Sequence, residues 1–141
     1  MDQKKYEFSQ NIAIFRTSRI IDIDCEELTN SEFSYLIVIH NLSKPVNSVY
    51  LSKYFGCTKV YVSKVVSKLM ELDYITKTQS PKDKRAFDLD LTEKGLAVVK
   101  QYMEKYVELT SILYDKLGEE KANQLDELLK LANKILKNLK A

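Results

Sequence analysis

The sequence is poor in the residues that break helices or cross-link chains. Its 141 residues include three glycines, two prolines, two cysteines and no tryptophan. So few glycines and prolines count against a turn-rich β-sandwich and favour a mostly helical protein. Cys25 and Cys57 lie far apart and form no Cys-x-x-Cys pair, which disfavours a disulfide framework or a thiolate metal site. We therefore expect reduced thiols and no bound metal.

Signals for export or membrane insertion are also missing. The first ten residues lack the apolar run and the cleavage site of a secretory signal, and no apolar stretch is long enough to span a bilayer. These absences predict a cytoplasmic protein with no membrane association. A chain of 141 residues has room for one domain with a substantial core.

Signatures of catalysis are scarce as well. The chain has a single histidine, His40, and neither a phosphate-binding loop nor a nucleophile elbow. One histidine cannot supply a typical nitrogen-rich zinc site. The acidic pairs Glu26-Glu27 and Glu119-Glu120 fall where helices are expected to begin, so an interaction with the helix dipole explains them better than catalysis. The sequence predicts no enzymatic activity and no cofactor.

Positive charge is distributed unevenly along the chain. The net charge is only +2, yet residues 44–85 contain nine Lys or Arg against three acidic residues, a balance of +6 that leaves −4 elsewhere. A basic middle between acidic flanks is typical of a module that binds a polyanion. A solvated lysine-rich face would give the same count.

Apolar residues at helical spacing predict helices on both sides of this basic stretch. A first helix is expected over 6–23, and a second follows Thr29 and Glu32, which have the spacing of a capping box. After Thr92 the spacing predicts a long helix that breaks near Gly118. A last helix carries a leucine-rich stripe wide enough to need more than one neighbour.

Between these helices the pattern is that of two short helices separated by a turn. The first is capped by Asn47 or Ser48 and ends at Gly56, and Thr58 can cap the second. The second helix is expected to bury a stripe formed by Val62, Val65, Val66 and Leu69. Its opposite face is basic and polar.

Two short segments, 74–79 and 86–91, come next, and the second alternates apolar and acidic residues with a period of two. This alternation predicts a β-hairpin whose connection, 80–85, is an exposed basic loop. Two helices followed by such a hairpin form the plan of a winged helix-turn-helix. In this plan the second helix presents its first residues to the major groove of DNA, and the hairpin reaches the adjacent backbone or minor groove.

The candidate DNA contacts follow from this plan. On the recognition helix they are Thr58, Lys59, Tyr61, Ser63, Lys64 and Lys68, of which Lys59, Tyr61, Ser63 and Lys64 are expected in the groove and Lys68, further along, at a phosphate. On the wing they are Lys82, Asp83, Lys84 and Arg85. Arg85 is suited to a narrow minor groove because a guanidinium is less strongly hydrated than an ammonium. Asp83 makes sense if it orients Arg85 and fixes the loop. Alternatively, Lys64 and Lys68 are simply solvated and Tyr61 packs on a neighbouring helix.

The run from Leu51 to Gly95, LSKYFGCTKVYVSKVVSKLMELDYITKTQSPKDKRAFDLDLTEKG, resembles the core signature of the MarR family of regulators. It includes an Asp-x-Arg wing motif at 83–85 and a closing Leu-Thr-x-x-Gly motif at 91–95. Two positions depart from the family pattern: Asp73 replaces a usual glycine and Ser52 a usual alanine. Asp tolerates left-handed backbone geometry and Ser is small, so the fold is not in doubt.

The resemblance implies a mainly α fold of six helices with a small β-wing. The single domain would comprise amino-terminal helices for dimerisation and support (1–45), the winged helix-turn-helix (46–91) and long carboxyl-terminal dimerisation helices (92–141). It also implies a homodimeric regulator that binds double-stranded DNA at an inverted repeat, acts as a repressor and is released by a small, often aromatic or anionic effector. The aromatic residues and Arg16 or Arg19 could line such an effector cavity, although a plain core or surface role is the simpler interpretation of them.

Two alternatives stay open. A winged helix can instead bind another protein, using the Tyr61 face or the last helix, although such a module would not need clustered basic residues. Some MarR relatives sense oxidants through a cysteine near the first helix, and Cys25 lies in that region. A small buried thiol is the simpler interpretation of Cys25 and Cys57.

Overall fold

The computed structural model describes residues 1–42 and 45–140, and its elements follow the order that the sequence predicts. Within these residues the chain forms six helices and one two-stranded sheet: α1 (Gln3–Thr17), α2 (Asn30–Asn41), α3 (Ser48–Phe55), α4 (Lys59–Glu71), β1 (Ile75–Gln79), β2 (Phe87–Leu91), α5 (Glu93–Leu117) and α6 (Glu119–Lys140). The predicted mainly helical fold with a small β-wing is confirmed. No helix of the described residues has the length and apolar character needed to cross a membrane.

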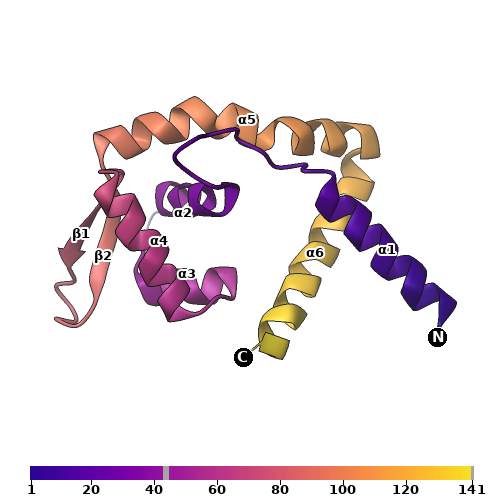
Figure 1. Ribbon diagram of the computed structural model, residues 1–141, viewed down its shortest axis with the longest axis horizontal. Coiled ribbons are helices and arrows are strands. Elements are labelled where there is room, and N and C mark those ends of the chain that lie inside the picture. The colour runs from indigo at the N-terminus through magenta and orange to yellow at the C-terminus, as the bar shows by residue number, and fades with distance from the viewer. Residues whose placement is uncertain (43–44, 141) are drawn as a thin grey trace.

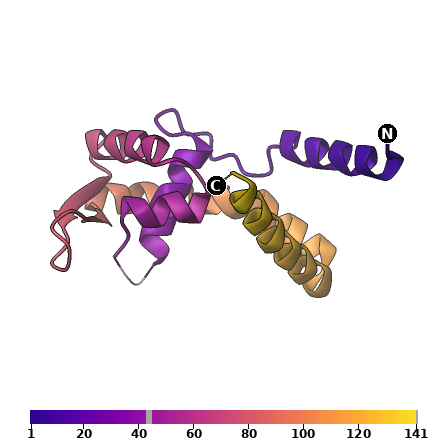
Figure 2. The same cartoon turned by 90° about the horizontal axis from the view of Figure 1, so that it is seen from below.

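The long helix α5 spans the molecule and joins its two ends (Figure 1). Helices α2, α3 and α4 and the β1–β2 hairpin lie beneath the amino-terminal half of α5. Helix α6 turns back beneath the other half, where the end of α1 meets α5 and α6. Seen from below, α1 extends away from the molecule on the side opposite the hairpin (Figure 2).

The core of the winged module is built on α2 and α4. The four residues of the predicted stripe, Val62, Val65, Val66 and Leu69, are between 0 and 7% exposed, which confirms that stripe. They belong to one apolar cluster with the fully buried Phe33 of α2. The Phe33 ring also packs against Tyr102 and Tyr106 of α5, with centroids 6.2 and 5.6 Å away. Helix α2 therefore connects the recognition helix to α5.

The caps that the sequence predicts are present. The side chains that accept a backbone hydrogen bond at the starts of α2, α3, α4 and α5 are Thr29, Asn47, Thr58 and Thr92. At α2 the Glu32 carboxylate completes the capping box by accepting from the Thr29 amide at 2.9 Å. Gly56 ends α3 with φ 62°, in the left-handed region that glycine adopts without strain.

The prediction for the first helix was wrong at its carboxyl end. Helix α1 stops at Thr17 rather than continuing to residue 23, and Arg19 follows with φ 51°. Residues 18–29 form a connection that Asn30 holds in place: its side-chain oxygen accepts from the Ile23 amide at 2.9 Å and its amide donates to the Ile21 carbonyl at 2.8 Å. Ile23 is buried in the core through this connection.

Glu26-Glu27 are consequently not at a helix start, contrary to expectation, because α2 begins at Asn30. The Glu27 carboxylate instead accepts a hydrogen bond from the Tyr74 hydroxyl. The other acidic pair, Glu119-Glu120, does lie in the first turn of α6 as expected.

Hydrogen bonds connect the junction between α4 and β1 to the start of α5. Asp73 adopts φ 62°, the left-handed geometry that the sequence predicts for this position. The Thr92 hydroxyl donates to the Asp73 carbonyl at 2.6 Å, and the Thr92 amide donates to the Tyr74 carbonyl at 3.0 Å. Gly95 lies directly against that carbonyl, because a Cβ on Gly95 would be 2.0 Å from the Tyr74 oxygen. These contacts therefore link the end of the recognition helix directly to the start of α5.

Candidate nucleic-acid interface

Helix α4 presents a polar and basic surface opposite its buried stripe. Thr58 accepts from the Tyr61 amide at 3.1 Å and so fixes the first turn of the helix. The exposed residues of the outer face are Lys59, Val60, Ser63, Lys64, Ser67 and Glu71. Lys59, Ser63 and Lys64, which the sequence predicted as groove contacts, are therefore exposed together on one side of α4.

One residue of this face was missed from the sequence. Val60 is 72% exposed although it is apolar, and it lies among the residues that the sequence marked as polar. Its spacing in the sequence indicates the exposed position, because Val60 falls outside the buried stripe and lies three, four and seven residues before Ser63, Lys64 and Ser67.

The wing is a short hairpin with a tightly held tip. Strands β1 and β2 pair antiparallel with Ile75 opposite Leu91 and Gln79 opposite Phe87. The Leu89 amide donates to the Val46 carbonyl at 2.8 Å, which ties the hairpin to the segment before α3. The wing is thus fixed relative to the helix-turn-helix.

Asp83 organises the tip through the main chain. Its carboxylate accepts from the Arg85 amide at 2.9 Å, and its carbonyl accepts from the Ala86 amide at 3.1 Å. Among the described residues, the side chains of Lys82, Lys84 and Arg85 are exposed and form no ion pair. The expected role of Asp83 in fixing the loop is supported, through the backbone of Arg85 rather than through its guanidinium.

A groove of about 360 Å³ separates the recognition helix from the wing. Ser63 and Ser67 line it from α4, and Lys77 and Arg85 line it from the hairpin. Asn47, the cap of α3, lines its end. The folded chain therefore brings the predicted helix and wing contacts Ser63 and Arg85 to one concave surface.

Comparison with known proteins identifies the family. Residues 28–87 match the model of the MarR family. The HTH-type transcriptional regulator BilQ of Clostridioides difficile (strain CD3) is 34% identical over 107 residues, which are 70% of this chain and 71% of the relative. This chain belongs to the MarR family. It is a DNA-binding transcriptional regulator, and its family consists of regulators rather than enzymes.

Solved MarR-family structures share the fold along nearly the whole chain. A MarR protein from Peptoclostridium difficile DA00132 superposes with a TM-score of 0.76 at 25% identity, covering 99% of this chain and 92% of that one. A mutant E. coli MarR complexed with operator DNA superposes with a TM-score of 0.75 at 20% identity, covering 93% and 99%. The winged helix-turn-helix predicted from residue patterns is confirmed.

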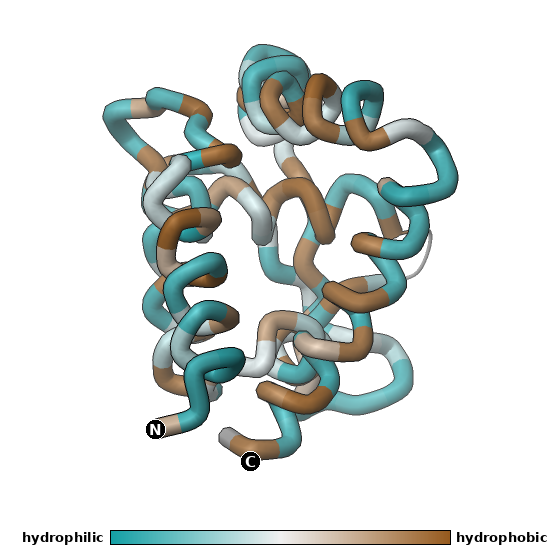
Figure 3. The backbone as a smooth tube through the Cα atoms, turned by 90° about the vertical axis from the view of Figure 1, so that its right-hand side faces the viewer, coloured by the Kyte–Doolittle hydropathy of each residue, from teal (hydrophilic) through white to brown (hydrophobic). Residues whose placement is uncertain are grey.

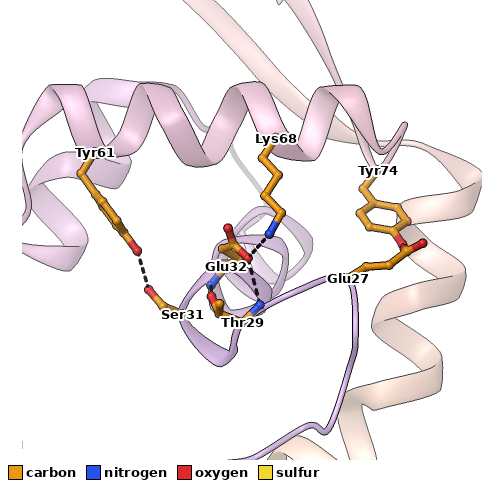
Figure 4. A network of polar contacts seen from close by, with 7 residues as sticks. All are labelled: Glu27, Thr29, Ser31, Glu32, Tyr61, Lys68 and Tyr74. Atoms are coloured by element: carbon orange, nitrogen blue, oxygen red, sulfur yellow. Dashed lines mark hydrogen bonds and ion pairs between the residues drawn. The ribbon is translucent and has the colours of Figure 1, made fainter.

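In this MarR-family regulator a network of polar contacts supports the inner side of the recognition helix (Figure 4). The Tyr61 hydroxyl lies 3.2 Å from the Ser31 hydroxyl, and the Lys68 ammonium donates to the Glu32 carboxylate at 2.7 Å. Tyr61 and Lys68 thus face α2, so the structure favours the alternative that Tyr61 packs on a neighbouring helix. The role of Lys68 as a phosphate contact stays a prediction.

The electrostatics of this network favour a charged Glu32 and a neutral Tyr74. Burial alone would raise the pKa of Glu32, but hydrogen bonds from Lys68 and Thr29 outweigh it and lower the pKa below its ordinary value of 4.5. Burial and the hydrogen bond to Glu27 raise the pKa of Tyr74 to about 12. At neutral pH the contact between Lys68 and Glu32 is therefore an ion pair, and Tyr74 is a neutral phenol that donates a hydrogen bond to Glu27.

Both cysteines of this regulator pack against the core. Cys25 and Cys57 are half-buried beside the apolar cluster, and the Cys57 sulfur lies 3.2 Å from the Tyr35 hydroxyl. This packing favours small structural thiols over an oxidant sensor at Cys25. In the described part of the chain, no group of three potential metal ligands is gathered.

Proposed function

We propose that this protein binds an inverted-repeat operator as a homodimer in the cytoplasm and represses transcription there. The observation that carries the proposal is the groove between α4 and the wing, where Ser63, Lys77 and Arg85 converge on one exposed surface. Hydroxyl groups suit base edges, and the cationic groups suit phosphates or a narrow minor groove. Repression is proposed because it is the commoner mode in the family.

A second copy of the chain is the proposed partner of α1, α5 and α6. Helix α1 has no buried residue in the single chain, although Phe8, Ile12 and Phe15 are apolar. Apolar and polar segments alternate along the chain near both termini (Figure 3). Exposed apolar side chains on the two other helices are Val107, Leu109, Ile112, Tyr114, Leu128, Leu129, Leu131, Ile135, Leu136 and Leu139. So much exposed apolar surface favours burial in an interface.

Symmetry connects the dimer to the operator. Two protomers related by a two-fold axis present two recognition helices, which fit half-sites about one helical turn apart. A two-fold dimer therefore selects a sequence that repeats in inverted orientation.

Effector release is the third part of the proposal. A cleft of about 500 Å³ lies between the end of α3 and the last turns of α6, at the place where the winged module meets a dimerisation helix. Tyr54 and Phe55 line it on one side, and Lys130 and Lys137 on the other. Lys130 is paired with Asp126 and Glu127, but the Lys137 ammonium lies 5.5 Å from the centre of the Tyr54 ring. The aromatic rings and the Lys137 cation suit a small aromatic anion. Such a ligand would alter the position of the winged module relative to α6 and hence the spacing of the recognition helices.

The deciding experiment selects DNA from a random duplex pool with the purified protein and with the variant Arg85→Ala. We expect an enriched palindrome with the wild-type protein and a loss of enrichment with the variant. Light scattering at micromolar concentration should give the mass of a dimer. No enrichment at low salt would instead support the protein-binding alternative, and a monomer would remove the basis for the inverted repeat.

A further inference from the structure

We propose that Val60 reads the sequence of the operator by packing against the 5-methyl group of a thymine in each half-site. This inference rests on the proposed binding of DNA and adds a base preference to it. Val60 is the second residue of α4, in the amino-terminal turn that a helix-turn-helix places deepest in the major groove.

The direction of the side chain is the first reason. With about 3.6 residues per turn, position 60 lies diametrically opposite the centre of the buried stripe, which Leu69 occupies. Val60 therefore projects from the middle of the outer face, between Ser63 and Lys64 on the next turn. No other large apolar side chain of residues 46–91 is as exposed as its 72%.

The second reason is that the fold gains nothing from valine at this position. A side chain left in solvent stabilises no core, and a β-branched residue is a poorer helix former than alanine. Valine would be useful here if a partner removed it from water. The flanking residues Lys59 and Lys64 are exposed cations, so the surface that covers Val60 must tolerate two positive charges.

Duplex DNA meets both requirements. Its phosphates attract the lysines, and the thymine 5-methyl is the apolar group that base edges expose in the major groove. Ser63 and Ser67 beside Val60 can donate to or accept from neighbouring base edges. The outer face of α4 thus combines one apolar contact with polar contacts on either side.

The test removes methyl groups from the DNA. Each thymine of the selected operator is replaced in turn by uracil, which keeps base pairing and deletes only the methyl, and affinity is measured for the wild-type protein, Val60→Ala and Val60→Ile. At one thymine per half-site, we expect the wild-type protein to lose about threefold to fivefold in affinity, the value of one buried methyl-sized group. Uracil at the same position should lower the affinity of Val60→Ile by a similar factor. It should lower the affinity of Val60→Ala by less than about twofold.

Folding does not obscure the result, since Val60 makes no core contact and Val60→Ala should keep the melting temperature within about 3 °C. An operator whose affinity is unchanged by uracil at every position would overturn the role of Val60 and leave the proposed function standing. The role of Val60 would also be overturned if replacing the thymine by uracil lowered the affinity of Val60→Ala as much as that of the wild-type protein. If the random pool yields no operator at all, the proposed function fails and the role of Val60 fails with it.

Discussion

The carboxylate of Glu32 joins two helices by accepting from the Lys68 ammonium at 2.7 Å and from the Thr29 amide at 2.9 Å. The same side chain therefore closes the capping box of α2 and holds the last turn of the recognition helix. Because α2 also packs on α5 through Phe33, the position of the recognition helix depends on contacts that lead back to α5.

The first prediction concerns the stability of this link in acid. Since the pKa of Glu32 in the folded protein lies below its ordinary value of 4.5, the charged carboxylate stabilises the fold above about pH 4.5, and this contribution is lost as pH falls through the lower pKa. The variant Glu32→Gln should reduce the free energy of unfolding by about 0.5–1 kcal/mol at pH 7. The difference should shrink as pH falls from 4.5 through the lowered pKa and vanish once Glu32 is protonated in both the folded and the unfolded protein.

Urea unfolding from about pH 7 to pH 3 measures this difference. Glu71→Gln is the matched control, because Glu71 lies on the exposed outer face of α4. If Glu32→Gln still reduced the free energy of unfolding by the same amount in acid, the shape or hydrogen bonding of Glu32, and not its charge, would account for the lost stability.

The second prediction separates two lysines of α4 by the salt dependence of DNA binding. Lys64 is exposed on the outer face, whereas Lys68 is paired with Glu32. In a dimer Lys64→Gln removes two exposed cations from the DNA-facing surface and should reduce the slope of log K against log salt by up to about 1.8, the value if each lysine also neutralises one phosphate beside the groove. Lys68→Gln should reduce it by less than half as much. Equal decreases would show that Lys68 leaves Glu32 when DNA binds.

The third prediction concerns the wing tip, where the Asp83 carboxylate holds the Arg85 amide at 2.9 Å. Asp83→Ala removes this acceptor and should lower operator affinity about fivefold for each wing that contacts DNA, the value of one hydrogen bond of roughly 1 kcal/mol. Asp83→Asn keeps an acceptor oxygen and removes a negative charge close to DNA, so its affinity should equal or exceed that of the wild-type protein. If both variants lost affinity equally, the charge of Asp83 would be the important property.

Local patterns were sufficient for the winged module. Caps, a buried stripe and an alternating strand are encoded within a few residues, so α3, α4 and the hairpin followed directly from the sequence. The residue pattern also placed Lys59, Ser63 and Lys64, the candidates for groove contacts, on the exposed face of α4. The pattern missed Val60 because residues were assigned to the outer face of α4 by their polarity and not by their angular position on the helix.

Contacts between distant residues were not predictable in the same way. The path of the chain after α1 depends on Asn30, which forms hydrogen bonds with the backbone of residues 21 and 23 from nine and seven positions away. Lys68 and Tyr61 face α2 because of partners 36 and 30 positions earlier in the chain. Nothing near these residues in the sequence indicates such partners, so an amphipathic pattern assigned them to the outer face.

The fourth prediction compares two glycines that the fold requires for different reasons. A Cβ on Gly95 would lie 2.0 Å from the Tyr74 carbonyl oxygen, while one on Gly118 would meet nothing within 4 Å. Gly95→Ala must displace either β1 or the start of α5 and should cost about 3 kcal/mol or more of unfolding free energy. Gly118 has φ 84° and ψ 156°, a backbone region that is essentially restricted to glycine, so Gly118→Ala should cost only the backbone strain of roughly 2 kcal/mol. Because Gly95 packs where α4, β1 and α5 meet, Gly95→Ala should also weaken operator binding in the molecules that remain folded. Thermal unfolding and DNA titration of the two variants measure both effects, and equal stability losses would show that α5 can shift away from Tyr74 at little cost.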